Sequence, residues 1–382
     1  MQNPPNGSGH LRIVFANSLR GVAALSVVVS HYFGVFWGDR VFVGKIGGFP
    51  PADEPTPSVV LLLDSLPSVN AGVLGVALFF LISGFVIPFS LQKMDVAGFI
   101  VNRLLRIVPT YAAGFAVTLT AIWWSSRYYG FEFPYQKWQV ILHFVPGLRD
   151  SIGFPNIDGI IWTLEIEVKF YIIAATMASL LRNGDLRVFL FPLALFAAVV
   201  IDGELRPGST DSNHLLWQFR YQSPFLIFMF IGVAFNYSYR KKFLLPSFVC
   251  LAAALFCGFY ISAGYLTRGC FTFLTGSYLT ALLIFVLASR VSDRWIDNAV
   301  LRLLAAISYP LYVCHAVAGY VVLAALLRSG IPAYLALLLT CAAAVAVSLL
   351  IHHLIEVPTQ HVDIRRLRRF FPAVRDATRA RR

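Results

Sequence analysis

Long apolar runs alternate with short polar or charged segments along the whole chain. A run of about twenty residues is long enough, as a helix, to cross a hydrocarbon layer of roughly 30 Å. Charged residues and Gly or Pro mark where such helices end. The pattern predicts about ten membrane-spanning helices, at residues 13–36, 69–91, 107–126, 158–181, 188–201, 216–238, 243–262, 270–289, 303–327 and 334–356.

The polar connections complete this picture. The run at 188–201 is short for a membrane span, and the stretch around 138–146 has the length of a helix lying in the membrane interface. The two long connections, 38–68 and 127–157, are rich in Gly and Pro and in aromatic residues respectively, and we expect both on the outer side. The predicted organisation is an N-terminal cytoplasmic segment at 1–12, a membrane domain at 13–356 and a basic cytoplasmic tail at 357–382.

Composition excludes an ordinary soluble protein. Of the 382 residues, 58% are hydrophobic and 13% are charged, whereas soluble domains have about 45–50% apolar and about 25% charged residues. The fold class is therefore an all-α, polytopic membrane bundle. The N-terminus lacks the features of a removable signal peptide, because its apolar stretch continues past Phe33, and we expect it to be retained.

The formal net charge of +12 has an explanation in the membrane. With a cytoplasmic N-terminus, most of the 31 Lys and Arg residues fall in inner segments, and many lie in the tail after Arg365. This bias predicts an even number of spans with both termini in the cytoplasm. Attraction of inner loops to anionic lipid headgroups accounts for the charge, so we expect membrane lipid and no nucleic acid as a partner. The sequence does not indicate the oligomeric state.

Neither a disulfide framework nor a metal site is indicated. The five cysteines lie in apolar runs without paired spacing. His352 and His353 are adjacent and so point in different directions on a helix, and together with His361 they have no nearby carboxylate set that suggests zinc. We therefore expect no metal.

Ionisable groups at membrane depth are costly and usually face the interior of a bundle. In the first predicted helix, Arg20 and His31 are eleven residues apart, which is about three turns and roughly 16 Å along one face. The alternative is that Arg20 reaches the inner headgroups while His31 bonds to a neighbouring helix.

The fourth predicted helix holds an unusual number of polar groups for a span, namely Trp162, Glu165, Glu167, Lys169 and Tyr171. Glu167 and Tyr171 share a face. Counted from the outer helix ends, His31 lies about 8 Å deep and Glu167 roughly 13 Å deep. A Glu167 carboxylate bonded to His31 would fix the imidazole tautomer and make it an effective base. The alternative is a structural bond between helices, with Lys169 neutralising one of the glutamates.

Two further arginines lie in the predicted inner loop before the third helix. Arg103 and Arg106 are three residues apart, so they share a helical face at the membrane boundary. Guanidinium groups bind phosphate oxygens through two parallel hydrogen bonds. Taken alone the pair indicates a positive-inside anchor, and with Arg20 on the same side it suggests a site for a phosphorylated donor.

These segments together resemble the acyltransferase 3 family of bacterial membrane acyltransferases, which includes O-antigen and other polysaccharide acetyltransferases and some macrolide acyltransferases. LRGVAALSVVVSH is similar to the family's signature of arginine, ten residues and histidine. The other similar segments, in chain order, are VALFFLISGFVI, RLLRIVPTY, WTLEIEVKFY, SYPLYVCHA and IEVPTQ. One departure is visible, because Glu167 is followed by Val168 where the family often has a second glutamate.

The resemblance implies an acyl-CoA donor, an acceptor hydroxyl on a glycan or glycoside, and a bacterial inner (plasma) membrane location. It implies essential roles for the residues that match the family's motifs, which are Arg20, His31, Arg103, Arg106 and Glu167. Acetyl-CoA would be a co-substrate, with no permanently bound cofactor.

From these expectations we hypothesise a mechanism. CoA phosphates would bind Arg103, Arg106 and Arg20, and the pantetheine arm would follow the first helix to His31. His31 would act as general base or as an acyl relay.

Other aromatic and ionisable residues are secondary candidates. Trp162 and Tyr171 could stack on an acceptor sugar, although aromatic residues at helix ends are often interfacial anchors. His315 and Glu356 also lie in predicted spans and have structural alternatives.

Two other functions fit a polytopic bundle with buried Arg, His and Glu. A proton-coupled transporter or glycan flippase is one, but no repeat relates the two halves of the chain. The other large class of membrane acyltransferases, built around Asn and His, finds only His315 as a match. A purely structural membrane protein would not need charged positions inside its spans.

Overall fold

The computed structural model describes residues 14–64, 69–147, 149–206, 214–242, 244–265, 271–291 and 298–361. All regular secondary structure in these ranges is helical. The predicted N-terminal segment, Cys270 and nearly all of the basic tail lie outside the described residues.

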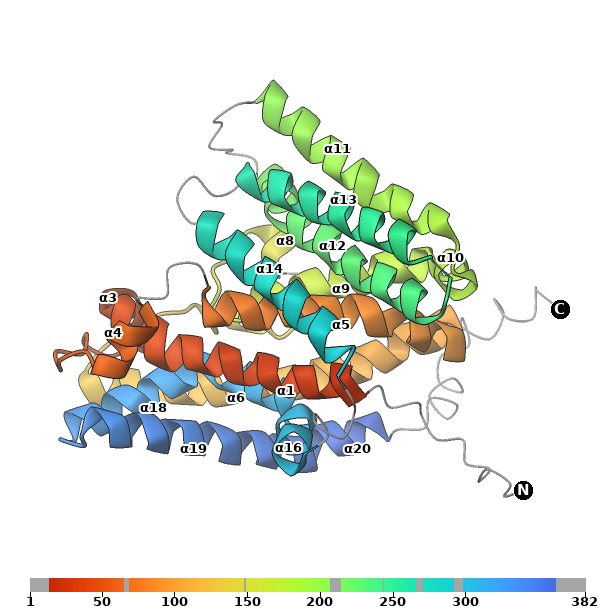
Figure 1. Cartoon of the computed structure of the whole chain (residues 1–382). Coiled ribbons are helices and arrows are strands. Elements are labelled where there is room, and N and C mark those ends of the chain that lie inside the picture. Colours follow the sequence, from red (N-terminus) through yellow and green to blue (C-terminus); the bar gives the residue numbers. More distant parts are fainter. Residues whose placement is uncertain are drawn as a thin grey trace, which may run out of the picture.

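Figure 1 shows the helices, most of which run roughly along one direction. In chain order they are α1 (Val14–Val29), η1 (Ser30–Val35), α2 (Phe36–Gly38), α3 (Arg40–Gly47), α4 (Ser58–Asp64), α5 (Ala71–Lys93), α6 (Val96–Tyr129), α7 (Lys137–His143), α8 (Arg149–Ile152), α9 (Ile161–Thr176), α10 (Ala178–Asn183), η2 (Leu186–Phe189), α11 (Leu190–Leu205), α12 (His214–Tyr239), α13 (Leu245–Gly264), α14 (Phe271–Ala288), α16 (Ala299–Ala306), α17 (Ser308–Cys314), α18 (Ala316–Arg328), α19 (Ala333–Ile351), η3 (His352–Glu356) and α20 (Val357–Gln360).

Each predicted span overlaps a helix, but the count of ten is not confirmed. In the described residues, six helices are long and apolar enough to cross a membrane, and a seventh results if α17 and α18, which bend by 63°, form one broken span. α9 has only 16 residues. These helices make the chain a multi-pass membrane protein. The start of α1 and the end of α20 lie at the same end of the bundle (Figure 1), and the cytoplasmic location of that end stays a prediction.

The predicted loop that carries Arg103 and Arg106 does not exist. α5 ends at Lys93 and α6 already begins at Val96, where the Asp95 side chain accepts a hydrogen bond of 3.0 Å from the Gly98 backbone N–H. This N-cap satisfies a free donor in the first turn and lets the helix start early. Both arginines therefore lie within a 34-residue helix.

The two long predicted connections are also partly helical. The first contains α3 and α4, and the second contains α7 and α8. α7 coincides with the stretch predicted as an interfacial helix. At the other end of the chain, α20 extends the last helix to Gln360, four residues beyond the predicted end of the membrane domain.

α5 is the central helix of the bundle and packs against α1, α12 and α14. Two glycines explain how closely its neighbours approach. A Cβ on Gly84 would lie 2.0 Å from the Met229 carbonyl oxygen of α12, and a Cβ on Gly75 would lie 2.6 Å from the Ala23 carbonyl oxygen of α1. Small residues of this kind permit close helix crossings in membranes.

Two apolar cores flank this central contact. The first joins α5 and part of α1 with α9 to α14, and the second joins the rest of α1 with α3, α6 and α17 to α19. In Figure 1, α11 lies at one edge of the bundle and α19 at the opposite edge. Phe79 and Tyr309 pack against both cores. We call the boundary between the two cores, where Phe79 and Tyr309 lie, the seam.

Candidate active site

His31 lies in the π-helical segment η1, which interrupts the regular hydrogen bonding of the first span. Single-turn π segments often occur at functional sites. The Nδ1 atom of His31 hydrogen-bonds to the Tyr320 hydroxyl of α18. The ring of His315 meets the ring of His31 edge to face, with centroids 4.7 Å apart. His31 is therefore held by two side chains from the α17–α18 part of the chain.

His315 occupies the break between α17 and α18 and is fully buried. Its Nδ1 lies 3.0 Å from the carbonyl oxygens of Leu311 and Tyr312. A carbonyl can only accept, so Nδ1 carries the proton and Nε2 is left as an acceptor. Nε2 has no partner among the described residues. The secondary candidate of the sequence thus lies directly beside His31.

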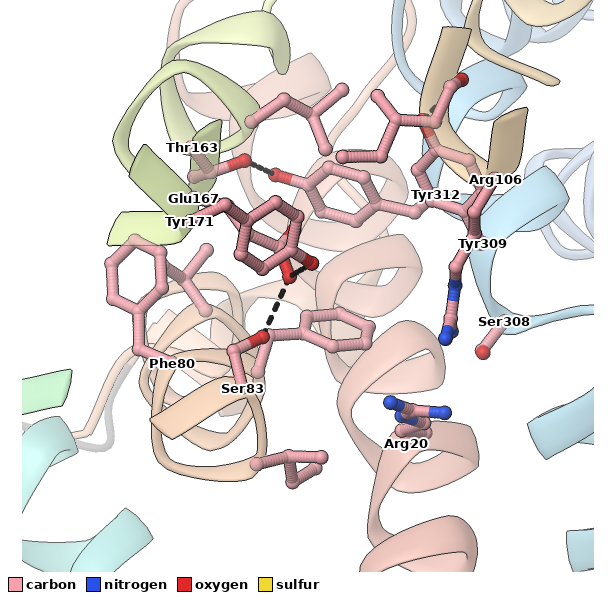
Figure 2. A pocket seen from close by; sticks show the side chains of 15 residues that line it. Arg20, Phe80, Ser83, Arg106, Thr163, Glu167, Tyr171, Ser308, Tyr309 and Tyr312 are labelled. Carbon is pink, nitrogen blue, oxygen red and sulfur yellow. Dashed lines mark hydrogen bonds between the residues drawn. The ribbon is translucent and has the colours of Figure 1, made fainter. Parts of the chain in front are cut away.

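Glu167 lines a second region of the seam, a narrow cavity of about 70 Å³. Its Oε1 atom accepts hydrogen bonds from the Ser83 hydroxyl at 2.6 Å and the Tyr171 hydroxyl at 2.5 Å. Figure 2 shows Glu167 between these two side chains. We call this space the arginine cavity, because Arg20 and Arg106 also line it.

Arg20 and Arg106 come from α1 and α6 and both reach the arginine cavity (Figure 2). Neither guanidinium makes a hydrogen bond or ion pair with any residue that the structure describes. Two cationic groups therefore face one carboxylate, which is already occupied by Ser83 and Tyr171. Half-buried cations without partners are costly, and an anion would offset that cost.

Arg103 does not line this cavity, contrary to the prediction of a paired site with Arg106. Its side chain is buried and hydrogen-bonds to the Ser90 hydroxyl at 2.5 Å. The guanidinium lies 5.4 Å from the ring centroids of both Phe99 and Tyr171. Arg103 therefore supports Tyr171, which in turn bonds Glu167.

The expected hydrogen bond between His31 and Glu167 is not present. Gly72 of α5 lies beside Ser30, since a Cβ there would be 2.6 Å from the Ser30 hydroxyl oxygen. Ser83, which bonds Glu167, follows eleven residues later on the same helix, which is roughly 16 Å along its axis. Glu167 is thus far from His31, at the level of Arg20.

The reason for this error is the start of α9. Depth counted from a helix end is valid only if that end lies at the surface. Ile161, the first residue of α9, is fully buried because the preceding segment enters the bundle. Glu167 is therefore deeper than its distance from the helix start suggests.

His31 lines a larger cavity of about 860 Å³. We call it the histidine cavity, and Trp162, Trp217, Tyr221 and Tyr278 form part of its wall. Val76 and Tyr312 line both this cavity and the arginine cavity, so the two spaces adjoin. The predicted aromatic pair is divided between them, because Trp162 lies in the histidine cavity and Tyr171 in the arginine cavity.

Comparison with known families decides the identity. The family model described as an acyltransferase domain, Acyl_transf_3, matches residues 13–353, nearly the whole chain. The chain belongs to the acyltransferase 3 family. It is a multi-pass membrane acyltransferase. No curated protein and no solved structure gives a match.

Lys169 does not neutralise Glu165 or Glu167 in this acyltransferase. Lys169 forms an ion pair with Asp150 of α8. Glu165 is bound by Arg149 through two parallel hydrogen bonds, one of them 2.9 Å between Nε and Oε1. These two pairs hold α8 against α9 and leave Glu167 to the arginine cavity.

The segment before α9 is anchored by Asp158. Its Oδ1 accepts hydrogen bonds of 3.0 Å from the backbone N–H groups of Ile160 and Ile161, and its Oδ2 accepts one of 2.7 Å from the Tyr111 hydroxyl. Burial acts to raise the pKa of Asp158, but the nearby His143, at 3.6 Å, together with these donors holds it below its ordinary value. The carboxylate therefore stays ionised at neutral pH.

The remaining histidine candidates do not form a metal site in the part of the chain that is described, where no cluster of three ligating side chains occurs. His352 Nδ1 instead lies 2.6 Å from Glu356 Oε2, one helical turn away, and His353 is exposed. His361 lies just beyond α20. Glu356 and His352 thus act as a local pair.

Sequence reasoning missed several residues that line the site. Tyr320, Ser83 and Tyr312 each contact a candidate residue or join the two cavities, and Trp217, Tyr221 and Tyr278 belong to the histidine cavity. Their neutral side chains do not stand out in spans that contain many aromatic residues. The tyrosines among them were a visible signal, because the polar end of a tyrosine needs a partner in an apolar helix.

Proposed function

We propose that this acyltransferase transfers an acyl group, specifically acetyl, from acyl-CoA to a hydroxyl of a glycan or glycoside. The observation that carries the proposal is the pair of adjoining cavities, with unpartnered guanidinium groups at one end and His31 at the other. This arrangement fits a donor with an anionic head and a reactive far end.

The donor would enter from the end of the bundle where α1 begins, which we take as cytoplasmic from the positive-inside bias. Arg20 and Arg106 would bind CoA phosphates, for which guanidinium forks are suited. The roughly 16 Å between Arg20 and His31 along α1 is comparable to the pantetheine arm. Arg103 and Glu167 would act by orienting Tyr171 and the arginine cavity rather than by contact with His31.

His31 would act as the general base. When Nδ1 carries the proton and donates a hydrogen bond to the Tyr320 hydroxyl oxygen, Nε2 keeps a free lone pair. Nε2 takes the proton of the acceptor hydroxyl, and the oxygen attacks the thioester carbonyl carbon. The new C–O bond forms, the C–S bond breaks, and the imidazolium returns its proton to the CoA thiolate.

A covalent variant uses the same atoms. Nε2 attacks the thioester carbonyl, the N–C bond forms and the C–S bond breaks, and the CoA thiolate takes the Nδ1 proton of the ring and leaves as a thiol. The acceptor hydroxyl then attacks the carbonyl carbon of the acyl-imidazole, the N–C bond breaks, and the hydroxyl proton returns to the imidazole, which restores His31. A burst of CoA release without acceptor would favour this variant, and strict dependence of CoA release on the acceptor would favour direct transfer.

The test is release of free CoA from acetyl-CoA by membranes containing the protein, with and without cell-envelope glycan. His31→Ala should abolish glycan-dependent release, and His353→Ala, which removes an exposed histidine of the last span, should not. Release unaffected by His31→Ala would discard the mechanism. Absence of release with any acyl-CoA, from folded protein, would favour a proton-coupled transporter. We further propose the bacterial plasma membrane as its location.

A further inference from the structure

One wall of the histidine cavity is a row of aromatic side chains from two helices. Trp217 and Tyr221 of α12 stack nearly parallel, with ring centroids 5.0 Å apart and planes at 9°. Trp162 of α9 meets Tyr221 at 5.9 Å. Trp217 is 45% exposed, and all three rings line the cavity. A ligand next to His31 would therefore contact broad aromatic faces.

Tyr278 of α14 also lines the cavity, and it carries a hydroxyl group. The residue is 1% exposed and lines the cavity, yet its hydroxyl has no hydrogen-bond partner in the part of the chain that is described. The ring is fixed by Phe259 and Phe228, at centroid distances of 4.6 and 4.5 Å. A buried hydroxyl without a partner is unfavourable, so a ligand that bonds to it would gain affinity.

These two features select among ligands. An aliphatic tail fills apolar space but cannot hydrogen-bond to the Tyr278 hydroxyl. A fully hydrated polar group gains little from aromatic faces. A sugar ring satisfies both, because it has an apolar face of C–H groups and hydroxyls at its edge.

The size of the histidine cavity agrees with this choice. About 860 Å³ lies within the range of small-molecule sites and far exceeds what an acetyl group needs. The arginine cavity, at about 70 Å³, is much smaller.

We propose that the aromatic row and Tyr278 form the acceptor subsite of this enzyme, which holds one sugar ring with a hydroxyl directed at His31. This inference rests on the proposed function, which it extends by naming the residues that bind the acceptor. Trp217 and Tyr221 stack on the ring, and the Tyr278 hydroxyl bonds to a ring substituent.

The experiment measures acceptor binding apart from transfer. Protein in lipid nanodiscs, free of sugar-headed detergent, is titrated with methyl glucoside and methyl galactoside in the absence of acyl-CoA. Transfer kinetics with acetyl-CoA and the better-bound glycoside follow. Tyr278→Phe removes one oxygen and keeps the buried ring, and Trp217→Ala removes the partly exposed platform. The matched controls are Tyr128→Phe and Trp123→Ala, which are exposed residues outside this cavity.

Tyr278→Phe should weaken glycoside binding and raise the acceptor KM by about 3- to 10-fold, and Trp217→Ala should do so by about 10-fold. The KM for acetyl-CoA should stay unchanged in both cavity variants. Glycoside binding and the acceptor KM should stay unchanged in both control variants. Unchanged glycoside binding in both cavity variants would overturn the subsite, as would a rise in the acetyl-CoA KM alone or binding of octanol in place of glycosides.

The experiment can refute the acceptor subsite and the proposed function independently of each other. If glycosides bind and Tyr278→Phe weakens them, the subsite is supported even when no acyl-CoA releases CoA. If acyl transfer occurs and neither cavity variant changes acceptor binding or the acceptor KM, the proposed acyltransferase function is supported and the proposed subsite is discarded.

Discussion

Replacing Arg106 with glutamine should separate ligand binding from stability. Arg106 points into the arginine cavity and makes no hydrogen bond or ion pair with any described residue. Glutamine keeps much of the side-chain volume and removes the charge. If the guanidinium binds a CoA phosphate, the loss should appear in donor affinity and not in folding.

The expected magnitude follows from the interaction that the substitution removes. A hydrogen bond to a charged group contributes about 1.5–3 kcal/mol, so acetyl-CoA binding should weaken by roughly 10- to 150-fold. No partner is left unpaired in the protein, so the melting temperature should fall by no more than about 2 °C. Arg149→Gln is the opposite case, because it strips Glu165 of a buried partner and should lower the melting temperature strongly.

The assay is titration of the nanodisc-reconstituted protein with acetyl-CoA and with acetyl-pantetheine, which lacks the nucleotide phosphates. Arg106→Gln should affect acetyl-CoA alone. The control variant is Arg187→Gln, whose side chain is 74% exposed and pairs with Asp185. Equal weakening of both ligands, or a fall in melting temperature as large as that of Arg149→Gln, would refute the assignment of Arg106 to the phosphates.

Three further perturbations test other parts of the molecule. Tyr320→Phe removes the partner of His31 Nδ1 and should lower kcat by about 3- to 10-fold with little change in KM for either substrate; an unchanged kcat would remove Tyr320 from the mechanism. Gly84→Ala should destabilise the bundle by about 1–3 kcal/mol, seen as a lower melting temperature, whereas Gly38→Ala, with open space around it, should not. Folding lowers the pKa of Asp158, so the stabilising effect of this carboxylate is present above the unfolded pKa of about 3.9 and is lost as the pH falls through the folded pKa. The difference in melting temperature between the wild type and Asp158→Asn should therefore narrow on acidification. A difference that stays constant with pH would contradict this assignment.

Each predicted span overlaps a helix of the structure, because long hydrophobic runs indicate segments that can be buried in lipid, although the count of ten spans is not confirmed. The sequence also placed Arg20 and His31 in one predicted span, and the structure has Arg20 in α1 and His31 in the π-helical segment η1 that follows it directly. The family resemblance named Arg106 and Glu167, which do line one cavity.

The contacts between helices were not predictable in the same way. Which residue of α9 faces which residue of α1 depends on where each helix starts relative to the others. The buried start of α9 at Ile161 shifted Glu167 away from His31. Likewise, the Asp95 cap that begins α6 early turned a predicted loop arginine, Arg103, into a buried support for Tyr171.

The break in the helix at His315 was equally hidden. SYPLYVCHA has the pattern of one apolar span, and its proline, Pro310, lies five residues before the bend of 63° at His315 rather than at it. That bend brings the His315 ring beside the His31 ring and lets the Tyr320 hydroxyl reach His31 Nδ1. The neutral aromatic residues of the histidine cavity were missed for a related reason, because aromatic side chains in a membrane bundle are common.

The narrowness of the arginine cavity has a consequence for the membrane itself. Two adjoining cavities in a membrane protein are a route by which protons and small cations could cross the bilayer and reduce the proton and ion gradients across it. Positive charge at a constriction repels cations and protons, as it does in selective pores. We expect the positive charges of Arg20 and Arg106 to hinder the passage of protons and cations through the arginine cavity when no donor is bound. The same two charges would thus keep the bilayer insulating between turnovers.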